Sequence, residues 1–358
     1  MKVCLFNSKV KNKFIDRETC LNEVGLNTGN LLFWHSLASI IDVDCHNYAE
    51  CECKEVDTRQ YQSFITTDLI WITENQNYEH VNNQLALAGD RPLIPISVGL
   101  QCDSYRSNFN MHPDTIKLLS AIQERAVIGV RGNYTAEILH SKGIKNIQVI
   151  GCPSMYYPFD YDFKIRKKDT EIKRVTCNMR TLYSSLDKEE QSFMLYCAKN
   201  KFCFCEQTSY GLSTKYCSNM RVYDTLNEWL NNYKTMFFDV ADWQEYMSSM
   251  DFSIGGRFHG NVVGLWNGVP GMFITIDSRT SELCKHFSLP TMDMKNFNDK
   301  KDIRYYYELA DYTEFNKNYP DRLDEFISFL KKNNLPIKRR YETYYDRKIS
   351  KLEQMMNL

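Results

Sequence analysis

Arg257 and His259 stand two residues apart in the glycine-rich segment Gly255-Gly256-Arg257-Phe258-His259-Gly260. A guanidinium can hold a carboxylate or a phosphate through two parallel hydrogen bonds, and an imidazole can move a proton near neutral pH. The apolar run 252–254 predicts a strand before this segment, and residues 261–266 predict a helix after it. The amino end of a helix suits an anion, because it carries free N–H groups and partial positive charge. The segment therefore predicts an active-site element for a small anionic substrate, with a structural glycine-rich turn as the alternative.

Two further arginines stand at similar crossings from strand to helix. Arg131 follows the predicted strand 126–130 and precedes a predicted helix, so we expect it to face the same cleft from the other side. A solvated arginine is the alternative there. Arg279 also lies near a helix start, but Glu282 one turn later could pair with it. A structural role for Arg279 is therefore nearly as well supported as a role in binding.

Small polar residues mark two more ends of predicted strands. The cluster Asn27-Thr28-Gly29-Asn30 precedes a helical pattern over 31–41. Asn27, Thr28 and Asn30 could bind an acceptor hydroxyl or could simply cap that helix, and the spacing favours neither. Gln101 follows the strand-like run 93–99 and is a candidate on the same acceptor side.

Strand-like and helix-like segments alternate along the chain, which is typical of parallel sheets covered by helices. A charged segment at 160–173 interrupts this rhythm, and 358 residues are too many for one ordinary core. We therefore expect an α/β protein with two Rossmann-like domains, at 1–160 and 161–320, and a closing helical tail at 321–358. Ligands of such domains bind at the carboxyl ends of the strands, so the cleft between the domains should hold the site. The predicted strands lie at 3–6, 69–72, 93–99, 126–130, 146–150, 173–178, 202–205, 236–240, 252–254 and 272–276.

The overall composition is that of a soluble globular protein. Hydrophobic residues make up 43% and charged residues 25%, and the formal net charge is -1. This balance argues against a nucleic-acid partner, which would need a broad basic face. The first residues do not resemble a signal peptide, and no apolar run approaches the ~20 residues that span a bilayer. We expect a cytoplasmic protein.

The sequence does not favour metal or cofactor chemistry. The thirteen cysteines are scattered, and the one cluster, Cys45, His46, Cys51 and Cys53, has only a C-x-C as its second pair. No G-x-G-x-x-G fingerprint, Walker loop, nucleophile elbow or H-E-x-x-H motif occurs. We expect no bound metal.

Several of these segments together resemble the polysaccharide pyruvyl transferase family. The most specific part runs from Gly256-Arg257-Phe258-His259-Gly260-Asn261 through Asn267-Gly268-Val269-Pro270 to Asp277-Ser278-Arg279-Thr280-Ser281-Glu282-Leu283. The pieces occur in the family's order and span about 25–290. The remaining pieces are Asn27-Thr28-Gly29-Asn30, Pro95-Ile96-Ser97-Val98-Gly99-Leu100-Gln101, Val130-Arg131-Gly132 and Ile150-Gly151-Cys152-Pro153-Ser154.

The resemblance implies a GT-B-like fold and a reaction. The donor would be phosphoenolpyruvate, and the acceptor a sugar of a bacterial surface polysaccharide or of its lipid-linked precursor. The product would be a cyclic pyruvate ketal, formed without a cofactor or a metal. A lipid-linked acceptor would also bring the protein to the inner membrane surface.

The family pattern also implies roles for particular residues. Arg131, Arg257 and His259 would meet the donor, with Arg257 stabilising the departing phosphate and His259 carrying protons. We also expect four further donor contacts, at Gly256, Gly260, Asn261 and Arg279.

Two other functions fit the same residues. A GT-B glycosyltransferase would use a nucleotide sugar, although no nucleobase pocket can be located in the sequence. A catalytically silent relative would only bind carbohydrate. The acceptor sugar, the stereochemistry of the ketal and the oligomeric state cannot be predicted from the sequence.

Overall fold

The structure is a computed structural model that describes residues 1–8, 13–14, 16–158, 160–169, 171–180, 187–208 and 219–341. Its N-terminal part is a parallel sheet in the order β2-β1-β3-β4, which isolated bridges from Ile72 to Leu100 and from Val98 to Val130 extend to the pair β5-β6. These strands are β1 (Val3–Phe6), β2 (Asp44–His46), β3 (Ser63–Thr66), β4 (Leu93–Pro95), β5 (Ile128–Val130) and β6 (Ile147–Val149).

The C-terminal part is a six-stranded parallel sheet in the order β12-β11-β10-β7-β8-β9. The chain winds outward in one direction from β7 and in the other direction from β10. The crevice between the ends of these two neighbouring strands is therefore the switch point, where ligands of such sheets bind. The strands are β7 (Val175–Asn178), β8 (Cys203–Glu206), β9 (Lys234–Met236), β10 (Phe252–Gly255), β11 (Gly271–Thr275) and β12 (Thr291–Asp293).

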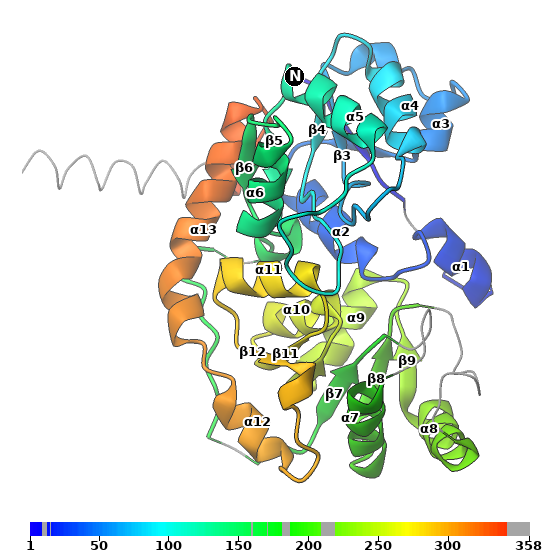
Figure 1. The fold of residues 1–358 in the computed structure, drawn as a ribbon, viewed down its shortest axis with the longest axis vertical. Helices are drawn as coiled ribbons and strands as arrows, with labels where there is room; N and C mark the ends of the chain where they lie inside the picture. The colour runs from blue at the N-terminus through cyan, green and yellow to red at the C-terminus, as the bar shows by residue number, and fades with distance from the viewer. Residues whose placement is uncertain are drawn as a thin grey trace, which may run out of the picture.

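Helices surround both sheets (Figure 1). Side-chain caps start most of those in the C-terminal part. Asp187 and Glu190 form a capping box on α7, and Asp239 and Asp277 cap α9 and α11. The helices are α1 (Arg17–Glu23), α2 (Asn30–Ile40), α3 (Tyr48–Glu52), α4 (Glu79–Ala88), α5 (Pro113–Gln123), α6 (Asn133–Ser141), α7 (Lys188–Lys199), α8 (Met220–Tyr233), α9 (Val240–Ser248), α10 (Phe258–Trp266), α11 (Ser278–Phe287), α12 (Ile303–Leu309) and α13 (Thr313–Lys332).

The long helix α13 joins the two parts of the molecule. It runs along one side of both sheets (Figure 1). After it, Asn333 exchanges hydrogen bonds with Val127, and Ile337 forms a bridge with Ile41. The predicted fold class is confirmed: the protein is an α/β structure with two Rossmann-like parallel sheets and a C-terminal helix, after which the chain returns to the N-terminal part.

The expected tail at 321–358 needs correction at its start. α13 already begins at Thr313 and contains Pro320, because the apolar positions from Phe315 to Leu330 form one continuous buried face. Residues 342–358 of the predicted tail lie outside the described residues. The expected boundary at residue 160 falls between β6 and β7, and the division into domains stays a prediction. Among the described residues, no helix is both long and apolar enough to span a membrane.

The predicted strand at 69–72 is wrong. Residues 69–71 form a turn and only Ile72 makes a bridge, whereas the strand lies just upstream, at β3. All four residues of β3 are buried, but Ser63 and Thr66 at its ends are polar. The strand therefore lacks the continuous apolar run by which a buried strand is recognised in a sequence. Trp71 is 41% exposed in the turn.

Candidate active site

Asn178, the last residue of β7, organises the start of the predicted active-site segment. Its carbonyl accepts a hydrogen bond from the Gly256 N–H at 3.0 Å, and its Oδ1 accepts one from the Arg257 N–H at 2.8 Å. Gly255 has a φ of +154°, and a Cβ there would collide with the Asn178 carbonyl. The two glycines therefore make room for the neighbouring strand and for Met179, which a Cβ on Gly256 would meet at 2.9 Å.

Asn261 does not face the cleft as a donor contact would. Its side chain is fully buried, and every polar atom of the amide is used. Its Oδ1 accepts hydrogen bonds from Ser253 Oγ and Asn178 Nδ2, and its Nδ2 donates to the Gly255 carbonyl at 2.9 Å. Asn261 thus holds the turn between β10 and α10 in place through buried hydrogen bonds. Gly260 packs as closely, since a Cβ there would meet Asn178 and Gln207 at 2.7 and 2.8 Å.

Arg257 is the N-cap residue of α10 and is half-buried. Its one side-chain hydrogen bond among the described residues is a long one, 3.4 Å, to Thr208 Oγ1, and its buried Nε has no partner there. No described carboxylate lies within 4 Å of the guanidinium. Burial lowers the pKa of Arg257, and repulsion from Arg279 and Arg180 lowers it further, against the attraction of Glu206.

Arg131 reaches the same region from the N-terminal part. It is only 4% exposed, and its Nε donates to the carbonyl and the hydroxyl of Ser97, both at 3.1 Å. Ser97 has a φ of +67°, a conformation rare outside glycine that tends to occur at functional sites. Gly99 leaves room for the arginine, since a Cβ there would meet Arg131 Cδ at 2.6 Å. Burial lowers the pKa of Arg131 to about 10, and no described carboxylate pairs with it.

The amino end of α6, next to Arg131, is not free for a ligand. Glu282 of α11 crosses from the other part of the molecule and accepts hydrogen bonds from the Thr135 N–H and Thr135 Oγ1. The alternative pairing of Glu282 with Arg279 is therefore wrong. Arg279 instead lies 3.2 Å from Asp277, which also caps α11. The Nε of Arg279 is buried without a partner among the described residues.

His259 is enclosed and lies near the three arginines of the site. It is 9% exposed, its Nε2 is 3.4 Å from the Cys152 thiol, and the Phe33 ring lies 5.7 Å away. Burial lowers the pKa of His259 to about 3, and the charges of Arg131, Arg279 and Arg257 act in the same direction. These surroundings disfavour the protonated imidazole at neutral pH, and the neutral form can accept a proton.

The loop 27–30 packs onto the start of α10. Gly29 is the N-cap of α2, and a Cβ there would meet Gln207 at 2.7 Å and His259 at 3.1 Å. The side chains of Asn27 and Asn30 bond within their own region, to the Gly29 N–H and to the Val24 carbonyl. Each side chain thus stabilises the loop with one of its two polar atoms, and the predicted acceptor contacts of Asn27 and Asn30 stay predictions.

Thr28 and Gln101 remain candidates for the acceptor side. The Thr28 N–H donates to the Gln207 carbonyl at 2.9 Å, while its buried Oγ1 has no partner among the described residues. Gln101 is half-buried, and its N–H donates to the Ile72 carbonyl. The next residue, Cys102, is hydrogen-bonded to Ser278 at the start of α11.

The sequence did not single out several residues that the structure brings to this site. They follow β7 and β8, so the rule that pointed to Arg257 could also have found them. Arg180 pairs with Glu190, and Gln207 has a buried Nε2 without a partner among the described residues. Four buried polar atoms of this site have no hydrogen-bond partner among the described residues: Thr28 Oγ1, Gln207 Nε2, Arg257 Nε and Arg279 Nε.

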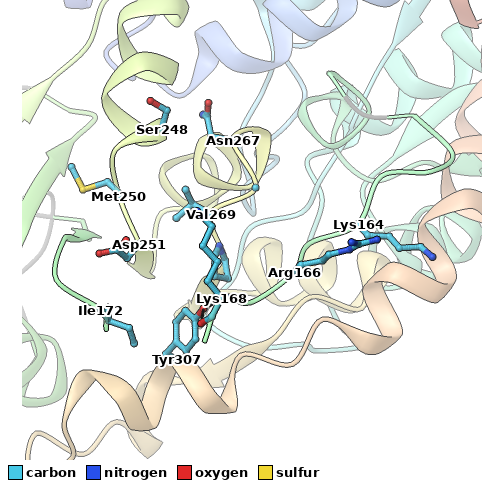
Figure 2. A pocket seen from close by; sticks show the side chains of 12 residues that line it. Lys164, Arg166, Lys168, Ile172, Ser248, Met250, Asp251, Asn267, Val269 and Tyr307 are labelled. Atoms are coloured by element: carbon cyan, nitrogen blue, oxygen red, sulfur yellow. Dashed lines mark hydrogen bonds between the residues drawn. The ribbon is translucent and has the colours of Figure 1, made fainter. Parts of the chain in front are cut away.

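A separate pocket of about 240 Å³ lies away from these residues (Figure 2). Asp251 and Pro270 line it, and they precede β10 and β11, so the pocket is at the amino edge of the sheet. The cations of this pocket come from the segment between the sheets: Lys164, Arg166 and Lys168.

The described residues contain no group of three or more histidine, cysteine or acidic side chains that could hold a metal. His46 of the cysteine cluster instead bonds to Tyr61.

Among solved structures, the chain is similar to S. aureus MnaA in its complex with UDP, with 12% identity, coverage of 92% of this chain and 98% of the other, and a TM-score of 0.43. It is also similar to the UDP-GlcNAc 2-epimerase from Neisseria meningitidis bound to UDP-GlcNAc, with 10% identity, coverage of 91% and 100%, and a TM-score of 0.42. At these values neither structure bears on the function of this chain. No curated protein matches the chain.

The family comparison is more specific. The family model "Polysaccharide pyruvyl transferase" matches residues 27–278, well over half of the chain. The match begins at the loop that packs on His259 and ends at Ser278, next to Arg279. It also includes both arginines that lack a carboxylate partner. The chain belongs to the polysaccharide pyruvyl transferase family.

Proposed function

We propose that this protein transfers a pyruvyl group from phosphoenolpyruvate to a sugar of a bacterial surface polysaccharide or its lipid-linked precursor, with release of phosphate. One observation carries the proposal. Arg131 and Arg257 come from opposite parts of the molecule, their charges both act on His259, and neither forms an ion pair with a carboxylate among the described residues.

A buried guanidinium without a counter-ion is costly, so its partner is expected to be a ligand. Phosphoenolpyruvate carries a carboxylate and a phosphate, which two guanidiniums can hold separately. Arg279 and Arg180 add positive charge, although Asp277 and Glu190 offset part of it. The Phe258–Gly260 amides at the start of α10 support the same anion.

The reaction balances with this donor and two sugar hydroxyls. The donor methylene takes up a proton and becomes the methyl group, which makes the central carbon electrophilic. The first hydroxyl oxygen bonds to that carbon, the bond from the carbon to the phosphate oxygen breaks, and the second hydroxyl closes the ketal. Of the two hydroxyl protons, one ends on the methyl group and the other on phosphate.

His259 is suited to move these protons. Its lowered pKa keeps the imidazole neutral, so that it can accept a proton from a sugar hydroxyl. The bound donor would offset the three arginine charges that lower the pKa of His259, so the protonated imidazole becomes stable enough to pass its proton on. Arg257 stabilises the negative charge on the departing phosphate.

The test is incubation of the purified protein with phosphoenolpyruvate and a lipid-linked or polymeric sugar fraction. We expect phosphate release and an acid-labile pyruvate ketal on the sugar, both lost in Arg257→Met. Release of nucleotide from a nucleotide sugar would contradict the proposal and favour a glycosyltransferase. Binding of phosphoenolpyruvate without phosphate release in any such fraction would favour a silent relative.

A further inference from the structure

Glu282 ties together the two elements that carry the site's arginines. It is 3% exposed on α11, and its Oε1 accepts the Thr135 hydroxyl at 2.7 Å while its Oε2 accepts the Thr135 N–H at 3.1 Å. Thr135 lies in the first turn of α6, where the free N–H groups favour an anion. A carboxylate from the C-terminal part therefore caps a helix of the N-terminal part.

The contact between α6 and α11 is close on both sides of Glu282. A Cβ on Gly132 would lie 2.9 Å from the Glu282 side chain, so the glycine lets the two parts approach. At the start of α11, Ser278 exchanges two hydrogen bonds with Cys102 and gives a third to the Leu100 carbonyl. Figure 1 shows α6 above α11, with the loop that precedes α5 descending to α11.

Each of the two helices in this contact contains or directly follows an arginine of the site. Arg131 precedes Gly132 and α6, and Arg279 is three residues before Glu282 on α11. A shift of α6 against α11 would therefore change the distance between Arg131 and the arginines of the C-terminal part. A free α6 amino end would also compete with them for the carboxylate or phosphate of a donor.

We propose that Glu282 is a positioning residue for donor binding, which sets Arg131 against Arg257 and Arg279 by capping α6 across the interface. The inference rests on the proposed function, because it assumes that the arginines hold phosphoenolpyruvate. The capping geometry needs a hydrogen-bonding side chain of this length and does not need its charge. A glutamine can accept the Thr135 N–H and donate to Thr135 Oγ1 in the same place.

Titration of Glu282 offers a readout that a purely structural role would not give. Burial and, to a smaller extent, the charge of Asp277 raise its pKa to about 7, against the Thr135 hydrogen bonds and the charge of Arg131. A cavity of about 600 Å³ borders Glu282 and gives it a path to solvent. Other charged or titratable groups around this cavity are Tyr105, Tyr134, Glu137, Lys285, His286, Arg322 and Glu325.

The sign of the pH effect follows from charge. Protonated Glu282 leaves the arginines less neutralised, and an anionic donor then binds more tightly. The donor affinity of the wild-type protein should therefore rise as the pH falls through 7. In Glu282→Gln this contribution to the pH dependence should disappear.

The experiment is titration of the full chain with phosphoenolpyruvate between pH 6 and 8. We expect Glu282→Gln to keep the wild-type affinity at pH 6 within about twofold, and Glu282→Ala to weaken it at least about tenfold. Glu137→Ala is the matched control, since Glu137 borders the same cavity from the exposed face of α6, and it should bind as the wild type does.

Two outcomes distinguish a failure of the positioning role from a failure of the proposed function. A folded Glu282→Ala protein that binds phosphoenolpyruvate as tightly as the wild type would overturn the positioning role alone. Absence of donor binding in the wild type would overturn the proposed function. The capping contact would then be judged by unfolding of Glu282→Ala, Thr135→Val and the double variant, where additive effects would refute it as well.

Discussion

Arg131 and Arg257 differ from the structural arginines of the same chain in what surrounds their guanidiniums. Arg91 donates to four backbone carbonyls, those of Thr58, Leu87, Ala88 and Tyr61. Arg131 is more deeply buried, yet within the part of the chain that the structure describes its side chain donates only from Nε, to Ser97. This contrast suggests that Arg131 contributes to ligand binding at some cost to stability.

We therefore expect Arg131→Met to keep or raise the free energy of unfolding without ligand, by up to about 2 kcal/mol, because it removes a buried charge that no described carboxylate contacts directly. The same variant should lose stabilisation by phosphoenolpyruvate. Arg91→Met should behave in the opposite way, with lower stability and an intact ligand effect. Thermal unfolding with and without the donor measures both, and a strong destabilisation of unliganded Arg131→Met would contradict this reading.

The neutral state of His259 predicts how stability depends on pH. The pKa of His259 is about 3 in the folded protein and 6.5 ordinarily, so the unfolded chain binds a proton that the folded chain does not. The free energy of unfolding should fall as the pH drops from 6.5 towards 3, by about 1.4 kcal/mol per pH unit for each such histidine.

His286, whose pKa burial also lowers to about 3, adds an equal contribution. His259→Gln and His286→Gln should each reduce the slope by one proton. Saturating phosphoenolpyruvate should reduce the slope further only where His259 is present, because the donor raises the pKa of that histidine. Denaturant unfolding at several pH values checks this, and a slope unchanged in His259→Gln would contradict the burial of a neutral imidazole.

The sequence predicted the arginines and the histidine because they follow apolar strand patterns within a few residues. It could not predict the pKa of His259. That value depends on Arg131, which is more than a hundred residues away, and on burial, to which Phe33 of α2 contributes. Asn261 was misread for a similar reason, since its partners Asn178 and Ser253 belong to two neighbouring strands.

At the level of elements, the turn from β10 to α10 depends on a glycine that only the paired strand explains. Gly255→Ala would place a methyl group against the Asn178 carbonyl at a φ of +154°. We expect it to lower the free energy of unfolding by about 3 kcal/mol or more, from overpacking and backbone strain together.

Gly268→Ala is the matched control, because Gly268 also has a positive φ, +71°, but open space around it. It should cost only about 1 kcal/mol. Denaturant unfolding of both variants provides the comparison. Equal losses would show that strain alone, and not the approach of β7, explains Gly255.

The predicted elements were most accurate where a cap or a proline marks the helix. The sequence predicts a helix over 113–123 with a proline at its start, and α5 has these bounds. The predictions failed at β3, whose polar end residues Ser63 and Thr66 are buried together with Phe64 and Ile65, and at 69–72, where apolar residues fill a turn. The sequence also predicts a helix over 242–250 with Asp242 as its cap, and this cap is wrong. Asp239 caps α9 instead, because its side chain accepts from the N–H groups of Ala241 and Asp242.

At the scale of the whole molecule, alternation of strands and helices predicted the two parallel sheets, but not how they meet. Glu282 on Thr135, Ser278 on Cys102 and the loop 27–30 on His259 join segments that are far apart in the sequence. These contacts enclose the arginine cluster, so the interface between the two parts is as much a component of the site as the residues that face the ligand.

The central claim is that this interface holds phosphoenolpyruvate between Arg131 and Arg257. Calorimetric titration of the full chain with phosphoenolpyruvate, with UDP as the comparison ligand, tests it most directly. We predict saturable binding of one phosphoenolpyruvate, no comparable binding of UDP, and loss of binding in both Arg131→Met and Arg257→Met. Saturable binding that survives both substitutions, or binding of UDP in place of phosphoenolpyruvate, would contradict the claim.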